Sequence, residues 1–376
     1  MGSEMCIRDR FICDCLANTI WIVYKALICS LLFAIHISCL EIQHGKMKFN
    51  SVLDKFRVES FTQKDKGTQF ERLMRSWLLS DPRYSNLNKV WMWEDFPSKK
   101  DFGGKDTGID LVARTDTGEY WAIQCKCYKE DAIIDKPAVD SFLATSSRTF
   151  LDVDSLQTTS FARRVWISTT NHWGTNAEEA IQNQNPPLNR VGLVDLQTSP
   201  VDWKLLLDGL EGKDAVLPGK QPREHQLRAM SAAHEYFETY DRGKLIMACG
   251  TGKTYTALKI AEDMLPDKGL VLFLVPSISL LGQTLNAWCA DATKPIKGIC
   301  ICSDAKASRK ISRIIKADED DTQDSTVDLA VPATTNPKNI ARQLKQYRSH
   351  DGLTVVFSTY CLLYTSPSPR DLSTSR

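Results

Sequence analysis

Carboxylate, amide and ammonium side chains lie close together in the first half of this 376-residue chain. Asp110 follows the turn-prone segment GGKDTG at residues 103–108, and Gln124 and Lys126 end an apolar run a short distance later. Mg²⁺ prefers oxygen ligands, and a lysine beside such a metal can orient or help deprotonate an attacking water. The pattern therefore indicates metal-dependent hydrolysis of a phosphodiester.

The elements that must position these residues are two short apolar runs, residues 109–113 and 120–125, with a turn between them at residues 116–118. Their length and composition predict a pair of neighbouring strands. Such a pair would present the carboxylate, the amide and the ammonium group at one edge of a sheet.

A helix is expected before these strands and further elements after them. Apolar residues recur at helical spacing within residues 61–79, where Glu71 could add a second carboxylate to the cluster. Residues 164–168 predict a strand, residues 176–182 a helix and residues 191–196 a closing strand. These elements together predict a mixed sheet with helices.

The motifs GTQFERL, GIDLVA and WAIQCKCY, in this order, resemble the Mrr-like branch of the PD-(D/E)xK nucleases, in which glutamine replaces the second acid. The resemblance covers residues 60–200. It implies that Asp110 is the principal ligand of Mg²⁺ and Glu71 a supporting carboxylate. Gln124 would stand in for the second acid, and Lys126 would be the catalytic lysine. The alternative interpretation is a turn cap at Asp110 and a solvated lysine at a strand end.

A second chemical motif, ACGTGKT, spans residues 248–254 between an apolar run and a helical segment. The turn Gly250-Thr251-Gly252 would let backbone amides point at phosphates, and the helix N-terminus would add partial positive charge. Lys253 would reach the β- and γ-phosphates, while Thr254 would ligate Mg²⁺. This motif predicts an ATP site.

The surrounding pattern is that of a parallel α/β unit. We expect a buried strand at residues 245–248, a helix at 253–264, a buried strand at 270–275 and a returning strand at 354–358. The polar and acidic segment 303–336 is expected to be a solvated insertion.

The MxxGxGKT form that begins at Met247 resembles superfamily 2 helicases and the motors of restriction enzymes. Gln226, in QPREHQ, occupies the position that contacts adenine in this superfamily. The sequence LVPS at residues 274–277 resembles the motif that tracks the DNA backbone, and FSTY at 357–360 resembles the strand before the DExH segment. The resemblance implies ATP as a cofactor and double-stranded DNA as a partner.

The expected organisation is α/β: a restriction-endonuclease-like mixed-sheet domain at residues 47–210, a linker at 211–222, and the N-terminal part of an incomplete RecA-like parallel domain at 223–360. This order resembles type ISP restriction enzymes. The resemblance implies that the remaining motor, a methyltransferase and a target-recognition domain would follow in a longer polypeptide.

Both ends of the chain are expected to be non-native. MGSEMCIRDR at the start and CLLYTSPSPRDLSTSR at residues 361–376 look like translated sequencing adapters, which places a native start at Met47 and sets residues 1–46 aside. Residues 19–40 are apolar enough to pass a membrane-helix window, so a membrane anchor is the alternative. We expect no membrane association and a cytoplasmic protein.

Composition adds little about the partner. Lys and Arg number 47 and Asp and Glu number 46, so bulk charge does not indicate nucleic-acid binding. The twelve cysteines form no pair of CxxC motifs, which favours reduced thiols over a zinc site.

The function expected is that of a DNA restriction endonuclease fragment, in which hydrolysis of DNA is coupled in the full-length enzyme to ATP-driven translocation. One alternative is the motor subunit of a type I or type III system. Another is a DNA-remodelling helicase whose N-terminal domain binds DNA without cutting it. Substitution of Asp110 or Lys126 would distinguish a nuclease from a pure binding domain.

Overall fold

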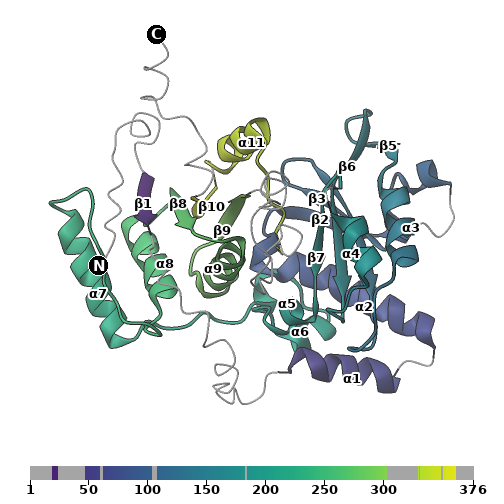
Figure 1. Ribbon diagram of the computed structural model, residues 1–376, viewed down its shortest axis with the longest axis horizontal. Helices are drawn as coiled ribbons and strands as arrows, with labels where there is room; N and C mark the ends of the chain where they lie inside the picture. Colours follow the sequence, from purple (N-terminus) through teal and green to yellow (C-terminus); the bar gives the residue numbers. More distant parts are fainter. Residues whose placement is uncertain are drawn as a thin grey trace, which may run out of the picture.

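The chain forms two α/β domains that lie side by side, each built on its own sheet (Figure 1). The computed structural model describes residues 19–23, 47–59, 62–103, 108–182, 184–302, 329, 331–348 and 350–360. A mixed sheet followed by a parallel sheet is the fold class that the sequence predicts, and it is confirmed.

The first domain contains a six-stranded mixed sheet in the order β2-β3-β4-β6-β5, with β7 also paired to β6. Strands β2, β3 and β4 are antiparallel neighbours, whereas β4, β6 and β7 run parallel. The carboxyl ends of β4 and β6 therefore meet at the same edge. The strands are β2 (Leu87–Met92), β3 (Leu111–Thr115), β4 (Tyr120–Lys126), β5 (Thr149–Leu151), β6 (Thr158–Ser168) and β7 (Leu188–Val191).

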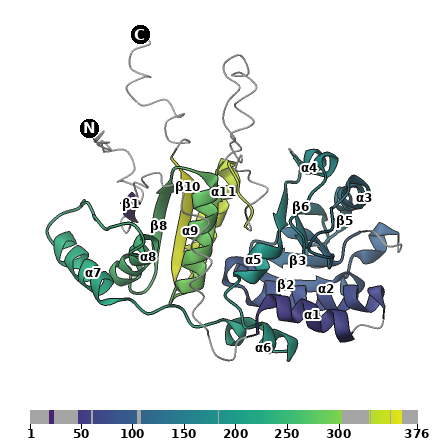
Figure 2. The same ribbon diagram turned by 60° about the horizontal axis from the view of Figure 1, so that its bottom comes forward.

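Helices cover both faces of this sheet, so it has a hydrophobic core on each side (Figure 2). One face carries α1 (Phe49–Glu59), α2 (Gln63–Ser80), α5 (Leu193–Gln197) and α6 (Trp203–Leu207). The other face carries α3 (Lys136–Ser146) and α4 (Thr175–Ile181). Short 3₁₀ turns connect them: η3 (Pro82–Tyr84), η4 (Trp93–Asp95), η5 (Lys99–Phe102) and η6 (Gly212–Ala215).

Helix α2 matters for the site because it holds Glu71 against the sheet. Its first turn is capped by Thr62, whose hydroxyl accepts a hydrogen bond from the Asp65 amide at 3.1 Å. Its side chains Phe70, Met74 and Trp77 are fully buried. Burial of each such side chain contributes roughly 1.5–3 kcal/mol, so packing rather than helix propensity holds this helix in place.

The second domain contains a four-stranded parallel sheet in the order β1-β8-β10-β9. All seven residues of β10 are buried, which is typical of parallel strands covered on both faces. Helices α8 and α9 pack on one face and α11 on the other. The elements are β1 (Thr19–Val23), α7 (Glu224–Phe237), α8 (Lys253–Met264), β8 (Gly269–Val275), α9 (Ile278–Asp291), β9 (Ile296–Ile301), α11 (Pro337–Tyr347) and β10 (Leu353–Thr359).

Two strand predictions are wrong. Residues 191–196 were expected to form a strand, but β7 ends at Val191 and α5 follows, because the Asp195 carboxylate accepts the Gly192 amide at 2.9 Å and starts a helix. Residues 245–248 form no strand, and Ile246 is 90% exposed. Strand β1 occupies the edge of β8 on the side away from β10, so that edge offers residues 245–248 no ladder to join.

A polar interface joins the domains at the β3–β4 turn and the turn after η3. Lys297 Nζ on β9 forms an ion pair with Asp116 Oδ2 at 2.9 Å, and Gln346 Nε2 donates to the Asp116 carbonyl at 2.7 Å. Ser85 Oγ donates to the Ile296 carbonyl at 2.7 Å. The parallel sheet of the second domain is therefore attached to the hairpin of β3 and β4.

Part of what the sequence predicts cannot be placed. The insertion predicted at residues 303–336 lies outside the described residues, apart from residues 329 and 331–336. Residues 361–376 also lie outside them. Of residues 1–46, only the strand Thr19–Val23 is described. No helix among the described residues is long and apolar enough to cross a membrane.

Candidate active site

Asp110 lies one residue before β3, and the backbone around it is held on both sides. Its amide donates to the Ile123 carbonyl at 2.9 Å, and its carbonyl accepts the Trp93 amide at 2.8 Å. The side chain is also fixed, because Oδ2 accepts hydrogen bonds from Gln124 Nε2 at 2.5 Å and from the Cys125 amide at 2.7 Å. The carboxylate is therefore oriented before any ligand binds.

The turn that precedes Asp110 depends on Gly108. Its φ angle is +70°, in the left-handed region that favours glycine. A Cβ atom at this position would lie 3.2 Å from Ser141 Oγ and 3.4 Å from Gln124 Oε1. Glycine thus lets the turn close against the buried Gln124 side chain.

Gln124 and Lys126 occupy the carboxyl end of β4, as the sequence predicts. Gln124 is 1% exposed, whereas Lys126 is half-buried at the edge of the sheet. The Lys126 carbonyl accepts the Thr169 amide at 3.1 Å, which ties the end of β4 to the residue after β6. The lysine therefore lies where the domain surface meets solvent.

The thiol of Cys125, between Gln124 and Lys126 on β4, is buried. Burial raises the pKa of this thiol well above its ordinary value, and the carboxylates of Asp110 and Glu71 raise it further, while Lys126 lowers it. The neutral thiol packs in the core and lacks the thiolate character that a metal ligand or nucleophile needs.

The donor set fits a magnesium ion. The described residues contain no group of three or more His, Cys, Asp or Glu side chains that could hold a metal. In the predicted site, Gln124 stands where a second acid would be. The oxygen donors would therefore be the carboxylates of Asp110 and Glu71 and the amide oxygen of Gln124. Mg²⁺ keeps several waters and is commonly held by one or two carboxylates, so this set is sufficient.

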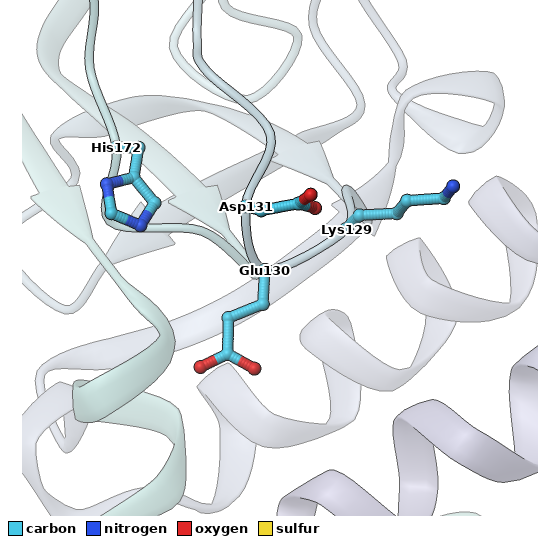
Figure 3. A pocket seen from close by; sticks show the side chains of 4 residues that line it. All are labelled: Lys129, Glu130, Asp131 and His172. Carbon is cyan, nitrogen blue, oxygen red and sulfur yellow. The ribbon is translucent and has the colours of Figure 1, made fainter.

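An open cavity of about 450 Å³ lies beyond the end of β4 and is lined by Lys129, Glu130, Asp131 and His172 (Figure 3). Its two loops are tied together, since Thr170 Oγ1 donates to the Glu130 carbonyl and the Ile134 amide donates to the His172 carbonyl, both at 2.9 Å. The four side chains point in different directions and do not converge as a ligand set. Sequence reasoning missed these loops because no motif marks them.

The phosphate-loop residues stand at the start of α8, as predicted. Gly250 and Gly252 have φ angles of +76° and +80°, and Gly252 is the N-cap of α8. Thr251 Oγ1 donates to the Ala248 carbonyl at 2.7 Å and closes the turn. Lys253 is the first residue of the helix. The loop therefore presents its glycines and the helix N-terminus together.

The Thr254 side chain is half-exposed in the first turn of α8, while its carbonyl accepts Trp288 Nε1 at 3.0 Å. Gln226 contacts the phosphate loop itself: its Nε2 donates to the Thr251 carbonyl at 3.0 Å, and its Oε1 accepts the Arg223 amide at 2.9 Å. The neighbouring His225 ring also contacts the Thr251 carbonyl, at 3.1 Å. Sequence reasoning missed His225, although it stands beside Gln226 in the quoted motif.

Comparisons with known proteins agree with this architecture. Residues 79–212 match the family model described as "Restriction endonuclease", and residues 219–359 match "Type III restriction enzyme, res subunit". No curated protein matches the chain. The chain therefore combines a restriction-endonuclease domain with a helicase module of the kind found in restriction enzymes.

Solved structures extend the likeness. The ATP-dependent Type ISP restriction-modification enzyme LlaBIII, bound to DNA, is 28% identical with a TM-score of 0.65; the match covers 86% of this chain but only 19% of that one. A nuclease-deletion mutant of the Type ISP enzyme LlaGI, in complex with a DNA substrate mimic, is 38% identical over 38% of this chain and 13% of that chain, with a TM-score of 0.30. The predicted resemblance to type ISP enzymes is confirmed over the part of LlaBIII that the match covers.

Proposed function

We propose that the mixed-sheet domain is a Mg²⁺-dependent DNA endonuclease, and that the parallel-sheet domain belongs to an ATP-driven DNA translocase to which cleavage is coupled in the full-length enzyme. The observation that carries the proposal is the orientation of the Asp110 carboxylate by two hydrogen bonds from the end of β4. Glu71 on α2 and Lys126 at the end of β4 would complete the site.

Each side chain has a defined task in this proposal. Asp110 and Glu71 would hold the metal, with the amide oxygen of Gln124 in the place of a second acid. A bound Mg²⁺ supplies neutralisation of charge on the phosphate and lowers the pKa of a coordinated water. Lys126, half-exposed at the sheet edge, would orient the attacking water and donate hydrogen bonds to the phosphodiester oxygens.

The nucleotide role rests on the loop before α8. Backbone amides of Gly250-Thr251-Gly252 would surround the phosphates of ATP, and Lys253 would pair with the β- and γ-phosphates. Thr254 would ligate the accompanying Mg²⁺. Gln226 and His225 would steady the loop from α7, since both contact the Thr251 carbonyl.

Plasmid cleavage by the whole chain tests the nuclease assignment. Supercoiled DNA is incubated with Mg²⁺ or Mn²⁺, alongside EDTA, and nicked and linear products are measured. We expect metal-dependent cleavage that falls at least about a hundredfold in Asp110→Ala and in Lys126→Ala, since each removes a group needed for metal binding or water activation. Lys99→Ala, a lysine of η5 outside the cluster, serves as the matched control.

The outcome distinguishes the nuclease from its alternative. Equal cleavage by the parent, Asp110→Ala and Lys126→Ala would mean that the cleaving residues lie outside this site or belong to a contaminating nuclease. DNA binding without cleavage, in a chain that melts cooperatively and binds ATP, would favour the DNA-remodelling helicase whose N-terminal domain only binds DNA.

A further inference from the structure

A second cavity, of about 280 Å³, lies in the nuclease domain, and its basic residues Lys89 and Arg114 lie at the opposite end of the strands from Asp110 and Gln124. Lys89 on β2 is the register partner of Arg114 on β3, and Arg114 is the partner of Tyr120 on β4. Asp110 and Gln124 lie at the other end of the same two strands. Tyr120 and Gln124 are four steps apart along β4, a distance of about 13 Å.

Aromatic rings form one side of this cavity. Trp91 is half-buried, and its ring lies nearly parallel to that of Tyr120, with centroids 6.2 Å apart and an interplanar angle of 18°. Phe96 meets both rings edge-on, at 5.8 Å and 6.1 Å. The three rings therefore contact one another at the wall of the cavity.

Cationic groups lie directly beside these rings. Lys89 is exposed, with Nζ 4.9 Å from the Trp91 ring centroid, and it makes no ion pair with any described residue. The Arg114 guanidinium lies 5.4 Å from the Tyr120 ring centroid. Its Nε atom is buried and has no hydrogen-bond partner among the described residues.

The two acidic groups nearby, Asp152 and Asp154, share one cation, Arg114. Asp154 lines the cavity and pairs with Arg114, which also lies 3.9 Å from Asp152. Asp152 accepts the Tyr120 hydroxyl at 2.9 Å, so that phenol is held as a donor away from the cavity. Lys89, which forms no ion pair with a described residue, lies at the rim beside the exposed residue Asn88.

We propose that this cavity binds one unstacked nucleotide of a DNA single strand, with the base on the Trp91 ring and the adjacent phosphate at Lys89. Aromatic faces bind any base by stacking, and basic side chains beside them follow the phosphodiester backbone. The contact between an exposed lysine and a ring is weak, so a base can replace it while the ammonium moves to the phosphate. Asn88 would meet the edge of the base.

This proposal deepens the proposed function. It rests on that function for one point only, that the ligand is DNA. The cavity adjoins the β3–β4 hairpin, whose turn residue Asp116 is bound to Lys297 of the motor domain. The cavity and the contact with the parallel-sheet domain therefore share one hairpin.

The test is binding of a dT oligonucleotide of about ten nucleotides that contains one 2-aminopurine. Stacking of that base on a protein ring quenches its fluorescence. The whole chain is used in the Asp110→Ala form, so the measurement requires no cleavage and stands even if the nuclease proposal fails. Trp91→Leu and Lys89→Ala are compared with Trp91→Phe, which keeps an aromatic ring, and with Lys100→Ala, an exposed lysine that does not line the cavity.

We expect quenching by the parent, a loss of affinity of about tenfold in Trp91→Leu and a smaller loss in Lys89→Ala. Trp91→Phe should retain most of the affinity and Lys100→Ala all of it. Equal affinity of all variants, or binding without quenching, would overturn the proposal. Because Lys89 is a surface side chain, its variant decides the matter if Trp91→Leu does not fold.

Discussion

Substitution of Gln124 by glutamate tests whether the cluster at Asp110 is built for a cation. The amide donor that now contacts Asp110 Oδ2 across 2.5 Å would become a second carboxylate, at a position that is 1% exposed. Two carboxylates at this distance cannot both stay ionised unless a cation lies between them. One must therefore bind a proton when no metal is present.

The size of the effect follows from the geometry. Repulsion between two unit charges 2.5 Å apart is about 7 kcal/mol at an effective dielectric constant of about 20. Protonation of one glutamate costs less: with an ordinary pKa of about 4.3, it requires about 3.7 kcal/mol at about pH 7. The destabilisation of Gln124→Glu without metal at neutral pH is therefore limited to about 3–4 kcal/mol.

The same substitution predicts the sign of a pH dependence. The pair's folded pKa lies above the unfolded value, so the variant loses stability relative to the parent as pH rises from about 4 through that raised pKa. Near pH 4 the pair shares a proton and the difference is small. Mg²⁺ should abolish most of the penalty at neutral pH, because it neutralises the second carboxylate.

Urea unfolding followed by tryptophan fluorescence measures this. Of the nine tryptophans, all but Trp21 and Trp288 lie in the nuclease domain, so the signal reports mainly on that domain. Gln124→Met is the matched control: it removes the amide without adding charge, so Mg²⁺ should stabilise it less than it stabilises Gln124→Glu. If Gln124→Glu were as stable as Gln124→Met in EDTA, or gained nothing from Mg²⁺, the assignment of this cluster as a metal site would be refuted.

Three further outcomes are expected. The exposed thiol of Cys249 should react readily with a maleimide, and ATP with Mg²⁺ should slow that reaction in the parent but not in Lys253→Ala, as measured by peptide mass spectrometry. Lys297→Met should weaken the interface between the domains by about 1–2 kcal/mol, a value between those typical of exposed and of buried ion pairs. It should also speed proteolysis between residues 216 and 222. An unchanged proteolysis rate would contradict a structural role for the Lys297–Asp116 pair. Burial raises the pKa of Tyr120 to about 12, so phenolate absorbance should show a late-titrating group that Tyr120→Phe lacks, and the stability it contributes should be lost as pH rises from about 10 to about 12.

The sequence alone determined the position of those site residues that a single strand, turn or helix start places. Asp110 and Gln124 could be paired because a short turn joins their strands, and strands so joined pair with each other. The helix at 253–264 was predicted with the bounds it has, since a glycine cap and an apolar stripe are local signals. Glu71 was predicted on its helix for the same reason.

Only the tertiary structure decided features that depend on partners far away in the chain. Residues 245–248 are as apolar as a buried strand, but a strand forms only where a sheet edge is open to it, and β1 occupies that edge of β8. The Lys297–Asp116 pair joins residues 181 positions apart, which no local pattern could predict. The aromatic cavity likewise needs β2, β3 and β4 side by side before Lys89 and Tyr120 share one surface, because registers between strands are set by packing of the whole sheet.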